Sequence, residues 1–324
     1  MKILEINDLC VTYIAGEKRI KAVDHVSFAI DEGDSLGIVG ESGSGKSTMA
    51  MAMLRLLDPR YTEITGAANY RGENLLTVDP RRLSELRWKD IAVVFQKSMN
   101  SLSPVHRIGE QFEDIYRVHE PKASKKEIRE RVEKLFAMVN LAPRVYNLYP
   151  HELSGGMLQR TSIALSLLFH PKILIMDEAT TALDVVTQGQ ILSEIKKLEK
   201  SIAVTRMMIT HDLSVVATSC QKIIVLYAGQ LMEFGYVRDV LANPRHPYTE
   251  GLVRSFPSLH GKKEELLSIP GSLPDLSNPP QGCIFAPRCP YATDQCRAHR
   301  PEPRHIDDLH VAACWRVKGG IQDA

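Results

Sequence analysis

The sequence lacks a long apolar run. No stretch approaches the roughly 20 consecutive apolar residues that span a bilayer, and apolar segments such as residues 173–176 have the length of one β-strand. The N-terminal residues also lack the layout of a signal peptide, because Glu5, Asn7 and Asp8 interrupt the apolar positions. We therefore expect the chain to stay in the cytoplasm and to owe any membrane role to a partner.

Neither sign of charge is in excess. Lysine and arginine total 40 against 39 aspartates and glutamates, which gives a net charge of +1. This balance argues for no nucleic-acid partner and for no binding to an anionic membrane surface. Hydrophobic residues make up 44% and charged residues 24% of the 324 residues, as in a soluble globular protein long enough for two domains.

Cysteine is scarce except near the C-terminus. Four of the six cysteines lie in the 42 residues from Cys283 to Ala324, and 5, 6 and 17 residues separate Cys283, Cys289, Cys296 and Cys314 in turn. In a reducing cytosol, clustered cysteines favour a metal over disulfides. Structural zinc sites usually pair ligands about two to four residues apart, and no such pair occurs. Four thiolates match the ligand number of an iron–sulfur cluster, so we expect [4Fe–4S], with Zn²⁺ as the alternative.

The segment around these cysteines is poor in regular structure. Residues 268–304 are rich in proline, cysteine and glycine, so we expect few helices or strands there. Such a segment needs a cross-link or another anchor to become ordered. A bound metal would supply that stability. Arg288 and Arg297 are expected to offset the charge of the thiolates.

The rest of the chain alternates between strand and helix patterns. Alternating apolar and polar residues predict an antiparallel pair of strands over residues 3–14 and 20–30. Later strands are separated by helical patterns, which is typical of a parallel sheet with right-handed crossovers. We expect strands at 35–39, 172–176, 206–209 and 223–227, and helices at 48–57, 124–141 and 187–200.

A glycine-rich loop follows the strand at 35–39. Residues 40–47, GESGSGKS, fit the pattern G-x-x-x-x-G-K-[ST] between a strand and a helix. The glycines let backbone N–H groups point at phosphate oxygens, and the helix N-terminus adds partial positive charge. Lys46 is expected to reach the β- and γ-phosphates, and Ser47 to ligate Mg²⁺. A chance glycine and serine loop is the alternative.

Two carboxylates follow the strand at 172–176. Asp177 and Glu178 lie where a parallel sheet binds ligands, at the carboxyl end of a strand. Asp177 is the candidate for the Mg²⁺ shell, and Glu178 for the group that polarises the attacking water. Alone, such a pair is more often a solvated loop, but an enzyme with a phosphate loop needs a second acidic strand end.

Residues 153–160, LSGGMLQR, resemble the signature of ABC ATPases. The other expected motifs occur in order: Gln96 after VVF, ALD at 182–184, and His211 after MIT. The resemblance covers about residues 1–255. It implies an α/β fold with an antiparallel β subdomain, a parallel-sheet core, a helical subdomain at about 97–160 and a small Pro/Cys-rich extension at 256–324.

The resemblance also implies roles for individual residues. Glu178, His211 and Gln96 would be catalytic, with Gln96 linking Mg²⁺ and water to the membrane partner, and Ser154 would cap a helix aimed at the nucleotide of the opposite subunit. Tyr13 would stack on adenine, or else be an ordinary strand aromatic. One departure is Ala179, where the family usually has proline after the catalytic glutamate. The expected ATP contacts are Tyr13, Gly40, Glu41, Ser42, Gly43, Ser44, Gly45, Lys46, Ser47, Thr48, Ser154, Gly155, Gly156 and Asp184, and the expected Mg²⁺ ligands are Ser47, Gln96 and Asp177.

A narrower resemblance concerns the type of transporter. SLSPVHRIG at 101–109, HPYT at 246–249, PGSLPD at 270–275 and GCIFAPRCP at 282–290 resemble the ATPase subunits of bacterial dipeptide and oligopeptide importers. That group also includes nickel and sugar-oligomer importers, and some members carry an iron–sulfur cluster. A structural or redox-sensing role fits such a cluster here better than a role in ATP chemistry.

The resemblance implies several partners at the cytoplasmic face of the membrane. These are two transmembrane permease subunits, a second homologous ATPase subunit that we expect to form a heterodimer, and indirectly a periplasmic or extracellular substrate-binding protein. The alternatives are a soluble ABC ATPase without a membrane partner, or a regulatory subunit that binds nucleotide only. The intact Glu178 and His211 argue against the last of these.

Overall fold

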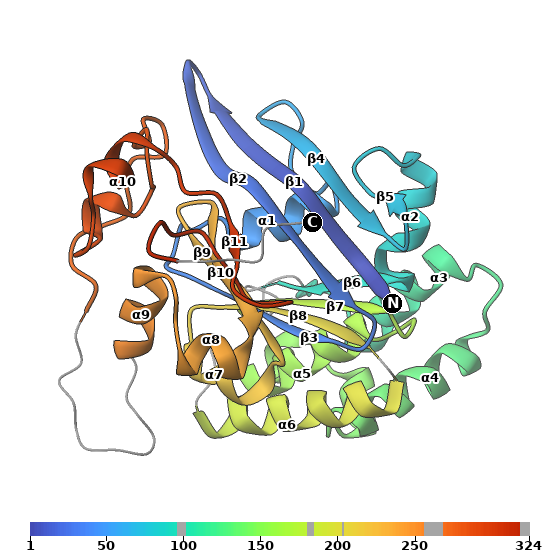
Figure 1. Cartoon of the computed structure of the whole chain (residues 1–324). Helices are drawn as coiled ribbons and strands as arrows, with labels where there is room; N and C mark the ends of the chain where they lie inside the picture. Colours follow the sequence, from blue (N-terminus) through green and yellow to red (C-terminus); the bar gives the residue numbers. More distant parts are fainter. Residues whose placement is uncertain (96–101, 180–184, 203, 256–267, 318–324) are drawn as a thin grey trace. The chain divides into compact units, whose positions relative to one another are not determined.

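The computed structural model describes residues 1–95, 102–179, 185–202, 204–255 and 268–317 (Figure 1). Two predicted site residues, Gln96 and Asp184, lie outside these residues. The chain forms two compact units, the first made of residues 1–78 and 208–324, and the second of residues 79–207. Each unit is described by itself.

An antiparallel sheet opens the first unit. Strands β1 (Lys2–Ala15) and β2 (Lys18–Asp31) form a long pair, and β4 (Thr62–Tyr70) and β5 (Glu73–Asn74) extend the sheet in the order β2-β1-β4-β5 (Figure 1). The alternation in the sequence thus predicted the pair correctly. The register of β1 against β2 shifts between Ile6 and Leu9, where Asp8 takes a φ of 50°.

A second sheet in the same unit has a parallel centre. Strand β3 (Ser35–Val39) pairs in parallel with β9 (Lys222–Tyr227), and β9 pairs antiparallel with β10 (Gln230–Tyr236). Every residue of β3 is buried, as expected for a strand covered on both faces. The chain end returns to this sheet through β11 (Arg304–His305) and β12 (Val311–Ala312), which pairs with β10.

Short helices surround the strands of the first unit. Helix α1 (Lys46–Met53) follows the glycine-rich loop and is shorter than the predicted 48–57, because Arg55 takes a φ of 50° that no α-helix continues through. Residues 268–317, the described part of the extension, contain little regular structure, as predicted. The other helical elements are α7 (Leu213–Ser219), α8 (Val237–Ala242), α9 (Pro247–Arg254), η4 (Ala286–Arg288) and α10 (Asp294–Ala298).

The second unit is rich in helices. Strands β6 (Ile91–Val94) and β7 (Ile173–Asp177) pair in parallel. Helix α4 (Lys125–Met138) begins after Ser124, whose hydroxyl accepts from Glu127 N at 3.2 Å, close to the predicted start. The other elements are α2 (Pro80–Lys89), α3 (Ile108–His119), η2 (Pro143–Asn147), η3 (Pro150–Glu152), α5 (Gly155–Ser166) and α6 (Val185–Ile202), and β8 (Thr205–Thr210) returns the chain to the first unit.

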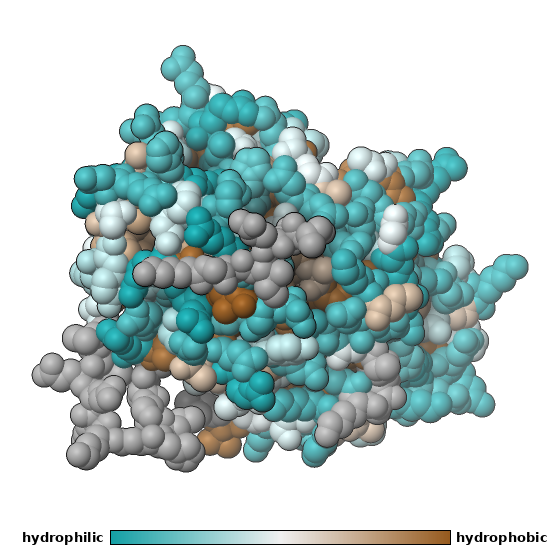
Figure 2. All heavy atoms as spheres, in the orientation of Figure 1, coloured by the Kyte–Doolittle hydropathy of each residue, from teal (hydrophilic) through white to brown (hydrophobic). Residues whose placement is uncertain are grey.

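Helices α3 and α4 bury apolar faces. The rings of Phe112 and Phe136 meet edge to face with centroids 5.5 Å apart, and Ile128, Val132 and Leu135 are fully buried. Among the described residues, no helix is both long and apolar enough to cross a bilayer. The face drawn in Figure 2 is largely hydrophilic, with apolar residues in separated spots.

Candidate functional site

The glycine-rich loop lies between β3 and α1. Gly45 takes a φ of 91°, and a Cβ added there would come 2.1 Å from the carbonyl oxygen of Ala22. A side chain at Gly40 would come 2.1 Å from Leu226 O. Neither position accepts another residue without moving the backbone, so the loop keeps the tight curl that the motif predicted.

Lys46 carries its charge inside this loop. Its ammonium donates to Gly40 O and Glu41 O, each at 2.8 Å, and to Ser44 Oγ at 3.2 Å. Lys46 is 5% exposed and Ser44 is fully buried, so the loop holds a largely desolvated cation at the start of α1. A buried cation at a helix N-terminus is the electrostatic setting that attracts a phosphate group.

Two other predicted nucleotide contacts belong to the same unit. The hydroxyl of Tyr13, at the end of β1, lies 3.2 Å from Thr48 Oγ1, so the predicted adenine-stacking aromatic contacts the residue that follows the loop. His211 is exposed and directly follows β8. Asp212 caps α7 by accepting from Ser214 N at 2.9 Å, which fixes the backbone beside His211.

The acidic pair occupies a strand end in the second unit. Asp177 is the last residue of β7 and is 5% exposed, and Glu178 follows it, half-buried, with a φ of 47°. Such a φ is uncommon for a residue with a side chain and often marks a functional position. Ala179 is buried behind it. The predicted position at a strand carboxyl end is confirmed, whereas the left-handed backbone had no signal in the sequence.

The signature segment begins helix α5. Ser154 Oγ accepts from Met157 N at 3.3 Å, so the predicted cap is confirmed. Ser154 and Gly155 are exposed, and Gly156 is half-buried with space for only a small side chain, since a Cβ there would lie 3.1 Å from Thr187 Cγ2. The N-terminal end of a twelve-residue helix therefore lies open to solvent.

The C-terminal extension and helix α9 both contact the phosphate loop, which the sequence did not reveal. Both carboxylate oxygens of Glu41 accept from Arg288 Nη1 at 3.0 Å, and Glu41 N donates to the hydroxyl of Tyr248 at 3.0 Å. Arg288 also donates to the hydroxyl of Tyr227 at 3.3 Å and to Pro270 O at 2.8 Å. Arg288 and Tyr248 lie in the segments APRCP and HPYT, so the only signal was a motif without an assigned role.

These contacts correct one expectation about charge. Arg288 binds Glu41 and Arg297 pairs with Asp294 at 3.0 Å, so neither serves chiefly to offset the thiolates. Burial raises the pKa of Cys289 and of Cys314, and the charge of Arg316 opposes this rise at both.

The four C-terminal cysteines influence one another. Burial raises the pKa of Cys283 to about 11, and the charges of Cys296, Cys314 and Cys289 act in the same direction. Cys283 N donates to Cys296 O at 2.7 Å, and a Cβ on Gly282 would come 2.2 Å from that same oxygen. The four thiols therefore form one group, and none of them is in a disulfide.

The distances between the Sγ atoms of the four C-terminal cysteines bear on which metal group they could bind. No three of the four Sγ atoms lie within 4.8 Å of one another in the described residues, which include all four cysteines. Tetrahedral zinc with bonds of ~2.3 Å would hold its thiolates about 3.8 Å apart. The thiols would have to move closer together to bind one zinc ion, and four thiolates are also the donor number that a [4Fe–4S] cluster takes.

The chain matches two protein families and is similar over nearly its whole length to transport ATP-binding proteins. The family described as ABC transporter matches residues 23–181, and the family described as oligopeptide/dipeptide transporter, C-terminal region, matches residues 232–296. A probable peptide ABC transporter ATP-binding protein, y4tR, of Sinorhizobium fredii is 44% identical over 97% of this chain and 95% of its own length. The oligopeptide transport ATP-binding protein OppD of Salmonella typhimurium is 43% identical over 97% of this chain and 93% of its own.

Solved structures agree with the sequence comparisons. The dimeric ATP-binding cassette MJ0796, in a post-hydrolysis state bound to ADP and Pi, superposes with a TM-score of 0.65 at 32% identity, over 72% of this chain and 99% of its own. The match in fold and the near full-length identity to transport ATP-binding proteins agree with the loop, acidic pair and signature described above. The chain therefore belongs to the ABC transporter family of ATP-binding proteins, and it carries the C-terminal region of the oligopeptide/dipeptide transporters.

Proposed function

We propose that this ABC-type ATPase energises the import of dipeptides or oligopeptides through membrane subunits to which it docks. The observation that carries the proposal is the combination of the phosphate loop closed around Lys46 with a C-terminal extension that contacts this loop through Arg288. Relatives over 40% identical across nearly the whole chain are described as peptide transport ATP-binding proteins.

The reaction is hydrolysis of ATP to ADP and phosphate. Lys46 would contact the β- and γ-phosphates, and Ser47, Asp177 and Gln96 would hold the Mg²⁺ that the family requires, which neutralises developing charge. Glu178 would orient the attacking water, and His211 would contact the γ-phosphate. Tyr13 is proposed as the adenine platform, supported by its contact with Thr48.

The signature helix is proposed to act on a second subunit. Ser154, Gly155 and Gly156 begin an exposed helix, and exposed N–H groups at a helix start bind phosphate. With Asp184, they would cap the ATP held by the phosphate loop of a homologous ATPase subunit, in a head-to-tail pair. The related cassette MJ0796 is itself dimeric.

The remaining partners follow from this role. We propose peripheral attachment at the cytoplasmic face of the membrane, on two permease subunits that receive peptide from an external binding protein. Residues 96–149 are the proposed docking region. Residues 1–255 would form the nucleotide-binding domain, since they hold every ATPase motif, and residues 256–324 the extension.

The extension is proposed to hold a [4Fe–4S] cluster. Cys283, Cys289, Cys296 and Cys314 would be its ligands, and the cluster would supply cross-linking and redox sensitivity when bound. Support comes from the number of the thiols and from their proximity, since the charges of the other three act on the pKa of Cys283. Anaerobic purification followed by iron, sulfide and zinc assays tests this, and a colourless protein with stoichiometric zinc would refute it.

The decisive test of function is peptide uptake. Cells carrying the chain with its permease subunits should accumulate a labelled dipeptide or oligopeptide, and Glu178→Gln should abolish uptake and trap an ATP-bound dimer. Glu17→Gln, at an exposed position, is the matched control. Uptake of nickel or of a sugar oligomer in place of peptide would overturn the assigned cargo, and normal peptide uptake by Glu178→Gln would overturn the assigned catalytic residue.

A further inference from the structure

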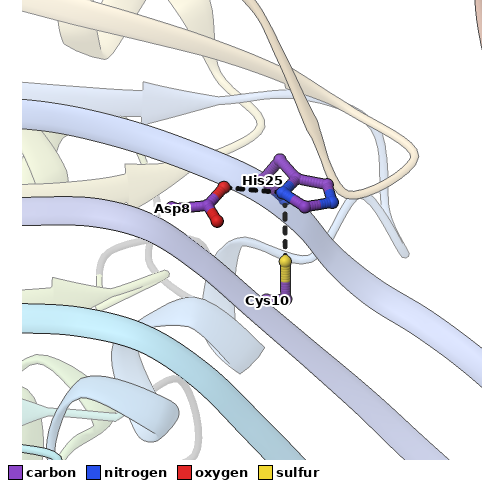
Figure 3. Close-up of side chains that lie close together, drawn as sticks. All are labelled: Asp8, Cys10 and His25. Carbon is purple, nitrogen blue, oxygen red and sulfur yellow. Dashed lines mark hydrogen bonds and ion pairs between the residues drawn. The ribbon is translucent and has the colours of Figure 1, made fainter.

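We propose that Asp8, Cys10 and His25 form a binding site for one zinc ion at the paired strands β1 and β2. Figure 3 shows the three side chains converging, Asp8 and Cys10 from β1 and His25 from β2. None of the three belongs to the ATP motifs or to the C-terminal cysteine group. Their ligand atoms all lie within 4.8 Å of one another, as no other three such residues do in the part of the chain that the structure describes.

The distances suit a tetrahedral ion after a small adjustment. Zinc bonds of ~2.0–2.3 Å place neighbouring ligand atoms about 3.3–3.8 Å apart. His25 Nδ1 and Asp8 Oδ1 are 2.6 Å apart, so an ion that replaces the shared proton needs this pair to open by about 1 Å. Asp8 and His25 are exposed and line a cavity of about 730 Å³, which leaves space for an ion and a water as fourth ligand.

The backbone holds the three ligands in place. Asp8 and His25 have φ values of 50° and 54°, and the register of the strand pair shifts between Ile6 and Leu9. Asp8 N donates to Ser27 Oγ at 2.9 Å. His25 N donates to Cys10 Sγ at 3.2 Å, and this bond holds the sulfur beside His25.

The buried carboxylate of Asp24 lies near the ring of His25. Asp24 is 8% exposed, and its Oδ2 accepts from Gln230 Nε2 at 2.9 Å and from Arg300 Nη1 at 2.8 Å. Its Oδ1 is buried and lacks a hydrogen-bond partner, while Lys21 Nζ lies 3.6 Å and His25 Nε2 3.8 Å away. Metal-ligating histidines characteristically donate their second ring N–H to a carboxylate.

This arrangement assigns each ring nitrogen of His25 a separate partner. An ion bound at Nδ1 fixes the proton on Nε2, which faces the unsatisfied Asp24 Oδ1. An exposed histidine–aspartate pair without metal would explain the contact to Asp8, but neither the adjoining thiol nor the buried oxygen. Sulfur and imidazole donors with one carboxylate suit Zn²⁺ and neighbouring transition metals, and disfavour Mg²⁺ and Ca²⁺.

Cobalt substitution tests the site directly. The C-terminal cysteines of the full chain are first loaded anaerobically with iron and sulfide. The chain is then titrated with Co²⁺ while the cobalt–thiolate absorption is recorded, and Zn²⁺ is added as competitor. The parent should bind one Co²⁺ with thiolate absorption that Zn²⁺ abolishes, and Cys10→Ser should lose this absorption. His25→Ala should bind at least about tenfold more weakly.

Two further variants test whether the cobalt signal comes from the proposed site and whether Asp24 orients His25. Cys220→Ser removes a half-buried cysteine outside the proposed site and should titrate like the parent. Asp24→Asn should keep the thiolate spectrum and weaken binding about tenfold, as expected for a residue that only orients a ligand. Equal Co²⁺ stoichiometry and absorption in the parent and in Cys10→Ser would overturn the proposal, and so would loss of the signal in Cys220→Ser.

Discussion

The phosphate loop and the C-terminal extension differ in how far along the chain their main polar contacts reach. In the loop, Lys46 donates to Gly40 O, Glu41 O and Ser44 Oγ, which belong to residues two to six positions away. The extension is tied down by contacts between residues far apart in the chain, such as Arg288 with Glu41 and Arg300 with Asp24, which are 247 and 276 positions apart. Neighbours in the sequence thus hold the Lys46 ammonium, whereas the extension depends on a surface that the rest of the first unit provides.

That surface is aromatic at its centre. Phe285 is 1% exposed, and its ring centroid lies 5.2 Å from that of Tyr227 and 5.4 Å from that of Tyr248. The sequence indicated an extension too poor in apolar residues to order itself without metal. The structure shows a buried aromatic anchor and an ion pair that act alongside any metal.

The largest effect is expected from removing that anchor. Phe285→Ala should lower the free energy of unfolding by about 3–5 kcal/mol, because a fully packed ring leaves a cavity. Urea unfolding followed by tyrosine fluorescence measures it. Tyr291→Ala, at a ring that is 42% exposed, is the control, and equal losses from the two variants would show that the extension is not anchored at Phe285.

The phosphate loop should respond in activity more than in stability. Lys46→Ala should slow Mg²⁺-dependent ATP hydrolysis by about 10²–10³-fold, because a charge aimed at the transition state is lost. Phosphate release measures this, with Lys18→Ala, at an exposed position, as the control. Hydrolysis at the parent rate would refute the assignment of the site.

The contact between the extension and the phosphate loop can be removed by a substitution that changes neither Lys46 nor the cysteines. Arg288→Ala removes the two bonds to Glu41 and should raise the KM for ATP about tenfold, since Glu41 and its loop lose an anchor worth about one charge-assisted hydrogen bond. Arg297→Ala, whose partner is the exposed Asp294, should leave KM unchanged. An unchanged KM in Arg288→Ala would mean that the extension does not position the loop.

A smaller effect should appear as a pH dependence. Burial lowers the pKa of His246 to about 3, and its Nδ1 accepts from Tyr248 N at the start of α9. Because the unfolded chain binds the proton more readily, stability should be complete above the unfolded pKa of about 6.5 and fall as pH drops from there towards 3. This histidine alone should account for about 1 kcal/mol between pH 6.5 and 5.5.

His246→Asn isolates that contribution. Asparagine retains an acceptor at the N-cap and does not titrate in this range, so the variant should lose less stability than the parent as pH falls. Chemical unfolding of both proteins at pH 6.5 and 5.5 gives the difference. Parallel losses would assign the acid sensitivity to other groups.

Local patterns predicted local structure well. The paired strands β1 and β2, the strand, loop and helix around Lys46, and the cap of α5 by Ser154 all follow from short-range periodicity and motif spacing. The end of α1 was misjudged because the left-handed backbone at Arg55 has no composition signal.

Contacts between distant segments were not predictable in this way. The bonds of Glu41 to Arg288 and Tyr248, and the convergence of Asp8, Cys10 and His25, require the register of paired strands and the path of the extension. A single sequence contains neither. The roles assigned to Gln96 and Asp184 rest on motif position alone, since both lie outside the described residues.

The short strand β12 affects what would happen if the chain were truncated before the extension. It pairs with β10 at Glu233 and Phe234, so the extension covers what would otherwise be the open edge of a sheet. The fully buried Glu233 also accepts from His310 Nε2 at 2.7 Å. A chain cut after residue 255 would expose unpaired backbone groups and a buried carboxylate together, and uncovered strand edges promote edge-to-edge aggregation. The extension therefore covers a strand edge that would otherwise be open to edge-to-edge pairing.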